Sequence, residues 1–128
     1  MKLLLDAHVL LWYFSGDPRL SPRCQAVLDD DGNSKWVSIA SLWEIAIKVG
    51  LGKIQLGQPF DQLFPTLLRK NQINVLTIST GHVSRLLTLP GIHKDPFDRI
   101  LVAQAASESL MIVTVDANIA KYPISVFW

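Results

Sequence analysis

The stretch KLLLDAHVLLWYF, residues 2–14, indicates the fold class of this chain. It begins with a short apolar run, Lys2 to Leu5, that has the composition of a strand. After Asp6 it continues into a segment, Ala7 to Phe14, that has the composition of a buried helix. Strand-like and helix-like segments alternate in the same way to the end of the chain, without an internal repeat or a long linker. This alternation predicts an α/β fold.

The remaining elements are expected from hydrophobic spacing, caps and turn residues. Ser21 and Pro22 indicate the start of a second helix, and Asp95 and Pro96 the start of the clearest one, because proline at the first helical position loses no hydrogen bond. Further helices are expected at 39–49, 59–70 and 79–90, the clearest helix at 96–109, and further strands at 36–38, 74–78, 111–115 and 124–128. A chain of 128 residues fits one domain, residues 1–128.

Composition excludes several classes of protein. The longest uninterrupted apolar stretch, Val9 to Phe14, is far shorter than the roughly 20 residues that a bilayer requires, and the start does not resemble a signal peptide, so we expect a cytoplasmic protein without a membrane span. Cys24 is the only cysteine, which excludes an intramolecular disulfide. The net charge is +1, so nucleic-acid binding would have to rely on local patches. A mean hydropathy of +0.28 suggests apolar surface reserved for a partner.

Two aspartates stand at the ends of predicted strands. Asp6 ends the first strand, and Asp116 directly follows residues 111–115, with the hydroxyl of Thr114 nearby. Open α/β sheets bind ligands at the carboxyl ends of their strands. The two carboxylates would therefore meet if their strands were near neighbours in a parallel sheet. The alternative for Asp6 is to cap the next helix.

Two further carboxylates lie in apolar helical segments. Glu44, one of only two glutamates, sits among apolar residues, where burial costs several kcal/mol unless a cation or strong donors meet it. It could instead belong to an exposed stripe and pair with Lys48 at i, i+4. Asp98 heads an apolar helix face, although Asp95 and Asp98 could also serve only as residues of a capped helix N-terminus.

A cluster of these carboxylates would have a specific chemistry. Grouped carboxylates repel one another and persist at neutral pH only with compensating cations. Oxygen ligands without histidine or cysteine favour Mg²⁺ or Mn²⁺ over zinc. Such ions activate water for hydrolysis of a phosphodiester.

Four ordered segments resemble the PIN-domain nucleases, and within them the VapC-type toxins of prokaryotic toxin–antitoxin pairs. The segments are LLLDAH at 3–8, SIASLWEI at 38–45, HKDPFDRILVAQA at 93–105 and VTVD at 113–116. The third is highly specific, and together they span nearly the whole chain. The resemblance implies a PIN-like three-layer α/β/α sandwich with a central, mainly parallel sheet of four to five strands.

The same resemblance implies the site and its partners. Asp6, Glu44 and Asp98 fall on the family's three core acidic positions, Asp116 on a fourth, more variable one, and Thr114 on its usual hydroxyl position. Asp95 belongs to one subgroup's motif and resembles a capping residue rather than a ligand. The implied activity is Mg²⁺- or Mn²⁺-dependent hydrolysis of RNA, in a homodimer that an antitoxin wraps and blocks.

Basic and aromatic residues near these motifs could contact RNA. Phosphates could be held by some of the basic side chains, and bases could stack on the aromatic ones, but exposed surface and core or interface packing are the alternatives. The basic residues are Arg99, Lys48, Lys94 and His93, and the aromatic ones are Trp12, Phe14 and Trp43. Metal ligation by His93 or His82 is the less favoured interpretation.

Two other classes of α/β protein with strand-end aspartates fit this sequence less well than a nuclease. A phospho-accepting receiver domain needs an acidic neighbour for Asp6, and a haloacid-dehalogenase phosphatase needs a second aspartate where His8 stands. Two alternatives remain open, namely a non-catalytic PIN-like binding or scaffold module, and an RNA-processing nuclease outside a toxin–antitoxin system.

Overall fold

Five parallel strands form the central sheet of the computed structural model, which describes residues 1–128. The strand order is β3-β2-β1-β4-β5, and every neighbouring pair is parallel. The strands are β1 (Lys2–Leu5), β2 (Ser34–Ser38), β3 (Ile73–Leu76), β4 (Met111–Val113) and β5 (Val126–Phe127). The first and fourth strands are therefore direct neighbours, although more than a hundred residues separate them.

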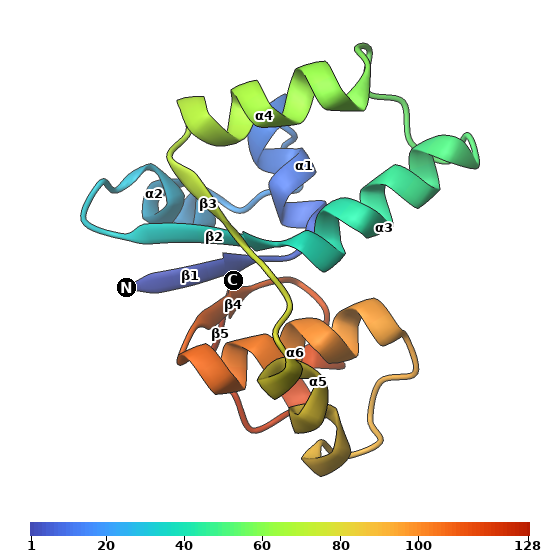
Figure 1. Cartoon of the computed structure of the whole chain (residues 1–128). Coiled ribbons are helices and arrows are strands. Elements are labelled where there is room, and N and C mark those ends of the chain that lie inside the picture. The colour runs from blue at the N-terminus through green and yellow to red at the C-terminus, as the bar shows by residue number, and fades with distance from the viewer.

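Helices cover both faces of this sheet (Figure 1). On one side lie α1 (Ala7–Ser15), α2 (Pro22–Asp29), α3 (Ile39–Gly50) and α4 (Phe60–Lys70). On the other lie α5 (Thr80–Arg85) and α6 (Pro96–Glu108). The α/β class that the sequence pattern predicts is confirmed, and so are the three-layer α/β/α sandwich and the mainly parallel sheet that the family resemblance implies.

Alternating side chains of β1 supply the core on both sides of the sheet. Leu3 and Leu5 pack in the cluster that contains α1, α3 and α4, whereas Leu4 packs in the cluster that contains α6. All three are fully buried. A parallel strand that is covered on both faces is apolar at successive positions, which explains the uninterrupted leucine run.

Several element ends differ from the predicted ones, and two of these differences have a clear physical reason. The expected strand at 111–115 ends at Val113, because the Thr114 hydroxyl accepts a hydrogen bond from the Asp116 N–H and turns the chain away from the sheet. The expected helix at 79–90 ends at Arg85 and continues only as a 3₁₀ turn, Leu86–Thr88. Pro90 explains the end of the 3₁₀ turn, because a proline favours an extended conformation at the residue before it, and Leu89 is extended.

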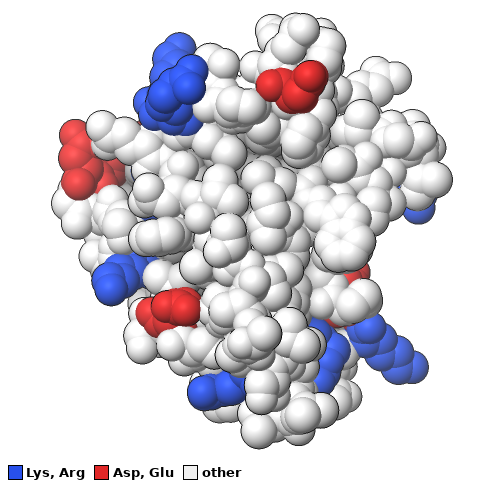
Figure 2. Space-filling model, viewed as in Figure 1, with Lys and Arg blue, Asp and Glu red and all other residues white.

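Charged side chains are scattered over the face of the molecule shown in Figure 2. Lysine and arginine alternate with aspartate and glutamate as isolated residues, and the surface between them is uncharged. This face carries no continuous basic stripe. None of the helices combines the length and apolar composition needed to cross a membrane.

Candidate functional site

Asp6 lies where β1 passes into α1, beside the end of β4. The parallel register pairs Leu5 with Val113, and the Asp6 N–H donates to the Val113 carbonyl at 3.2 Å. The carboxylate is 7% exposed and accepts from the Val9 N–H at 2.9 Å and from the Thr114 hydroxyl. Burial raises the pKa of Asp6 above its ordinary value, although these hydrogen bonds oppose the shift. Asp6 is therefore both the helix cap that the sequence suggested and a buried acidic group at the sheet edge.

Glu44 lies in the middle of α3 with its side chain only 12% exposed. Its carboxylate is 3.7 Å from the Lys48 ammonium, which is the pairing proposed from their i, i+4 spacing. Burial raises the pKa of Glu44, Lys48 lowers it, and the negative charges of Asp95 and Asp6 raise it further. The ion pair is thus partly buried, and Glu44 remains close enough to the other acidic groups to sense their charge.

Asp98 and Asp116 are brought to the same point by different elements. Asp98 lies in the first turn of α6, and Asp116 lies in the turn after β4. The Nε2 atom of His93 is 3.1 Å from an oxygen of each carboxylate. One ligand atom from each of these three residues lies within 4.8 Å of the other two, so this group could hold a metal ion.

The two carboxylates of this cluster differ in their electrostatics. Burial raises the pKa of Asp98 to about 7, with further upward contributions from Asp95, Glu44 and Asp116 and an opposing one from His93. Burial also opposes ionisation of Asp116, but hydrogen bonds from His93 and from the Asn118 N–H lower its pKa below the ordinary value. Asp98 is therefore the group that a bound cation would stabilise most.

The four predicted acidic residues differ in how closely the structure brings them together. Asp98 and Asp116 share one ligand-sized cluster, whereas Asp6 and Glu44 are coupled to it through their charges. The oxygen-rich donor set, with several carboxylates that are costly to bury alone, fits Mg²⁺ or Mn²⁺. Asp95 accepts from the Phe97 N–H at 2.8 Å and caps α6, as predicted.

Two side chains have roles that differ from the sequence interpretation. His93, a candidate phosphate-binding residue in the sequence, lies between Asp98 and Asp116. The only sequence signal was its place two residues before the cap of α6. Arg99 does not face outward toward a phosphate, because its guanidinium donates to the carbonyls of Pro90 and Leu86 and to the Tyr122 hydroxyl.

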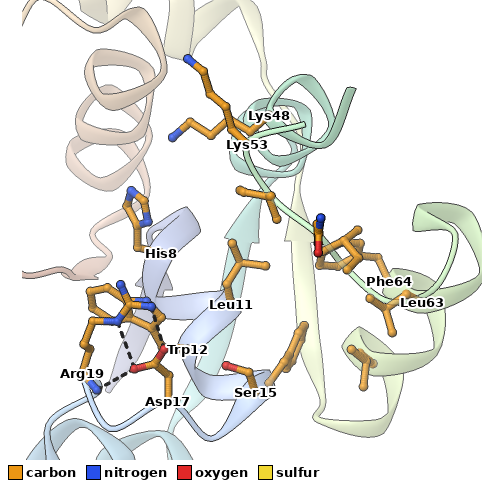
Figure 3. A pocket seen from close by; sticks show the side chains of 15 residues that line it. His8, Leu11, Trp12, Ser15, Asp17, Arg19, Lys48, Lys53, Leu63 and Phe64 are labelled. Atoms are coloured by element: carbon orange, nitrogen blue, oxygen red, sulfur yellow. Dashed lines mark hydrogen bonds and ion pairs between the residues drawn. The ribbon is translucent and has the colours of Figure 1, made fainter. Parts of the chain in front are cut away.

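A groove of about 650 Å³ begins beside the acidic residues. His8 and Lys48 line it, and His8 is close enough to Asp6 and Glu44 to lower the pKa of both. In Figure 3, Lys48 and Lys53 lie together at one end, and Leu63 and Phe64 form a wall contributed by α4. Arg19 is neutralised by Asp17 at 2.7 Å and covers the Trp12 ring. The groove thus combines an apolar floor with a basic end.

Comparison with known proteins gives one family match. The family described as PIN domain matches residues 3–124. A search of curated proteins found no match.

Solved structures with a similar fold come from toxin–antitoxin complexes. A chain of VapBC2 from Rickettsia felis, in a complex with a promoter DNA fragment, is 14% identical with a TM-score of 0.73, covering 99% of this chain and 98% of that one. A chain of a toxin–antitoxin complex from Klebsiella pneumoniae is 23% identical with a TM-score of 0.64, covering 98% and 96%. A chain of VapBC-1 from nontypeable Haemophilus influenzae is 16% identical with a TM-score of 0.65, covering 99% and 97%.

The raised pKa of Asp98 predicts a pH-dependent stability of the metal-free protein. Because folding raises this pKa to about 7 from 3.8, the folded state holds the proton more tightly, and the resulting stabilisation is lost as the pH rises from about 4 to about 7. Asparagine cannot ionise. In urea unfolding with EDTA, Asp98→Asn should therefore be more stable than the parent protein at pH 8, and the difference should shrink toward pH 4.

An exposed aspartate gives the control for this measurement. Asp61→Asn, at the exposed start of α4, should follow the pH profile of the parent protein. Parallel profiles for the parent and Asp98→Asn would contradict the raised pKa.

Proposed function

Because this chain belongs to the PIN domain family, whose model matches residues 3–124, we propose that it is a ribonuclease that depends on Mg²⁺ or Mn²⁺ and acts as the toxin of a toxin–antitoxin pair. The observation that carries the proposal is the meeting of Asp98, at the start of α6, with Asp116, in the turn after β4. An oxygen of each carboxylate is 3.1 Å from one nitrogen of His93. Two ionised groups held so close require a positive or proton-bearing group between them.

We assign the metal to Asp6, Glu44, Asp98 and Asp116. When bound, the divalent ion supplies the Lewis acidity that activates water and stabilises charge on the phosphate oxygens. The protein's own groups hold the carboxylates in place. Thr114 donates to Asp6 and thereby orients it, and Lys48 balances part of the charge of Glu44.

The surroundings of the acidic residues support a nucleic-acid substrate. Lys48, Lys53 and His8 line the adjacent groove, and a phosphate backbone is attracted by such local positive charge even when the net charge of the whole chain is +1. Trp12 lines the same groove, and an unpaired base could stack on its ring once Arg19, which covers it, moves aside. We propose RNA as the substrate because of the family resemblance and because basic side chains and an aromatic ring line one groove beside the acidic residues.

The toxin role rests on the full-length similarity to chains from toxin–antitoxin complexes. The similarity covers 98–99% of this chain and 96–98% of the three chains described above. We propose a cognate antitoxin as the protein partner. An RNA-processing nuclease is the alternative, which the gene neighbourhood distinguishes.

An exposed apolar stripe on α3 supports a homodimer. Ile39, Trp43, Ile47 and Leu51 recur every fourth residue and are 41%, 61%, 40% and 65% exposed. Residues at this spacing lie on one side of a helix. A stripe of this kind can pack against the same stripe of a second copy, because a two-fold interface is self-complementary.

Metal dependence and one substitution test the catalytic proposal. The purified protein should cleave single-stranded RNA with Mg²⁺ or Mn²⁺ and stop when EDTA is added. Asp98→Asn should lower the cleavage rate by about 100-fold or more and leave the circular dichroism spectrum unchanged, because a direct ligand matters at least as much as the groups that orient ligands. Asp61→Asn should cleave at the parent rate.

Two results would contradict this assignment. Cleavage by Asp98→Asn at the parent rate would show that the site has been placed wrongly. A parent protein that binds RNA without cleaving it at any metal concentration would favour the non-catalytic scaffold.

The toxin role predicts a specific gene arrangement. A short reading frame immediately upstream should encode a DNA-binding protein that copurifies with this chain and stops RNA cleavage in vitro. A solitary gene whose expression leaves growth unchanged would instead favour RNA processing.

The homodimer is tested on the stripe itself. Leu51→Glu should convert the dimer into a monomer in size-exclusion chromatography with light scattering, because it places a charge in an apolar interface. Leu87→Glu, at a residue 89% exposed on the other side of the sheet, is the matched control and should remain dimeric. A monomeric parent protein, or a dimeric Leu51→Glu variant, would exclude this surface as the interface.

A further inference from the structure

We propose that His93 is a positioning residue that donates a hydrogen bond from Nε2 to Asp116 and holds this N–H beside Asp98, and that a divalent ion must displace this donor rather than bind to it. The proposal rests on the metal-dependent function proposed above. It assigns a role to a histidine whose distances alone would also suit a metal ligand.

The other ring nitrogen determines where the proton of His93 lies. The Asp95 N–H donates to Nδ1 of His93 at 3.2 Å. A backbone amide can only donate, so Nδ1 must present its lone pair. In the neutral ring the proton is then on Nε2, which faces the oxygens of Asp98 and Asp116 at 3.1 Å each. The ring therefore donates a hydrogen bond to Asp116 and keeps its N–H beside Asp98.

This arrangement is the reverse of the one that metal-binding histidines use. A ligating histidine offers the lone pair of one nitrogen to the metal and donates the N–H of the other to a carboxylate, a carbonyl or water. Ligation through Nε2 would move the proton to Nδ1. Two donors, Nδ1–H and the Asp95 N–H, would then face each other at 3.2 Å. Ligation would thus require the ring or the backbone to move.

The backbone of His93 is held as firmly as its ring. The Tyr122 hydroxyl accepts from the His93 N–H at 2.8 Å and from the Arg99 guanidinium at 3.2 Å. Arg99 also donates to the Pro90 carbonyl at 2.9 Å. The side chain of His93 is only 16% exposed. These contacts fix the histidine from two sides and oppose the movement that ligation would need.

One donor between two carboxylates is a weaker substitute for a cation. The Nε2–H reduces the repulsion between Asp98 and Asp116 when no metal is bound, and a divalent ion would use the same oxygens. The two compete, so metal binding includes the loss of the charge-assisted hydrogen bond to Asp116 and of the close contact with Asp98. Removing the imidazole should therefore strengthen metal binding, whereas removing a ligand would weaken it.

The tautomer can be measured on the unaltered protein. Two-bond ¹H–¹⁵N correlation spectra of the ¹⁵N-labelled chain in EDTA should give His93 as the Nε2–H tautomer, and the same tautomer should persist after saturation with diamagnetic Mg²⁺. An Nδ1–H tautomer in either state would overturn the proposal.

Metal affinity gives the second test. In calorimetric titrations with Mn²⁺ and no RNA, His93→Ala should bind about tenfold more tightly than the parent protein, which corresponds to about 1.4 kcal/mol. His93→Gln, whose amide can donate to the same oxygens, should bind within about threefold of the parent, since the donor is retained. Leu87→Ala, at an exposed residue, should be unchanged. Unchanged or weaker binding by His93→Ala would overturn the proposal.

The proposal and the proposed function can fail separately. If the parent protein binds no Mn²⁺, the metal-dependent function is wrong, while the tautomer in EDTA still decides whether His93 donates. Electron spin-echo envelope modulation of the Mn²⁺-loaded parent protein would detect a directly coordinated imidazole through its ¹⁴N signal. If Mn²⁺ binds, and this signal is present in the parent and absent in His93→Ala, the displacement proposal is wrong and the metal-dependent function stands.

Discussion

The parallel pairing of β1 with β4 is the constraint on which the acidic site depends. The register places Leu5 opposite Val113, and the Asp6 N–H continues the ladder to the Val113 carbonyl. The Thr114 hydroxyl then reaches the carboxylate of Asp6 and also accepts from the Asp116 N–H. A shift of one residue in this register would direct alternate side chains to the opposite face and separate these groups. The leucines of β1 are buried on both sides of the sheet, so the hydrogen bonds of Asp6 with Val113 and Thr114 define the register at this end of the strand.

Charge repulsion is the cost of this arrangement, and different residues are stabilised in different ways. Asp6 receives two hydrogen bonds, and Glu44 lies beside Lys48. Asp116 receives hydrogen bonds from His93 and the Asn118 N–H, which lower its pKa. Asp98 has the least compensation, and burial raises its pKa to about 7. In the metal-free protein, the ionised form of Asp98 at the start of α6 is therefore the least stabilised of the four carboxylates. A cation bound there would have the greatest effect.

Local sequence signals were reliable where local chemistry decides the structure. Asp95 caps α6 and Pro96 occupies its first position, as their side chains dictate. Ser21 caps α2 for the same reason. The predicted end of one strand was wrong because a side-chain hydroxyl competes with the sheet for the backbone. The strand expected at 111–115 ends at Val113, because the Thr114 hydroxyl accepts from the Asp116 N–H. The strand propensity of Val115 contains no information about the hydrogen bond that ends the strand. In the same way, the sequence around Arg99 does not show that its guanidinium donates to the Pro90 and Leu86 carbonyls.

The sequence by itself determined the α/β class, the order of the elements, the helix caps and the identity of the acidic residues, because hydrophobic spacing and cap chemistry are properties of neighbouring residues. The tertiary structure alone decided that β1 and β4 are adjacent, that Asp98 and Asp116 meet while Asp6 and Glu44 stand slightly apart, and that His93 lies between two carboxylates. These depend on strand order and on backbone donors such as the Asp95 N–H, whose directions exist only once the chain has folded.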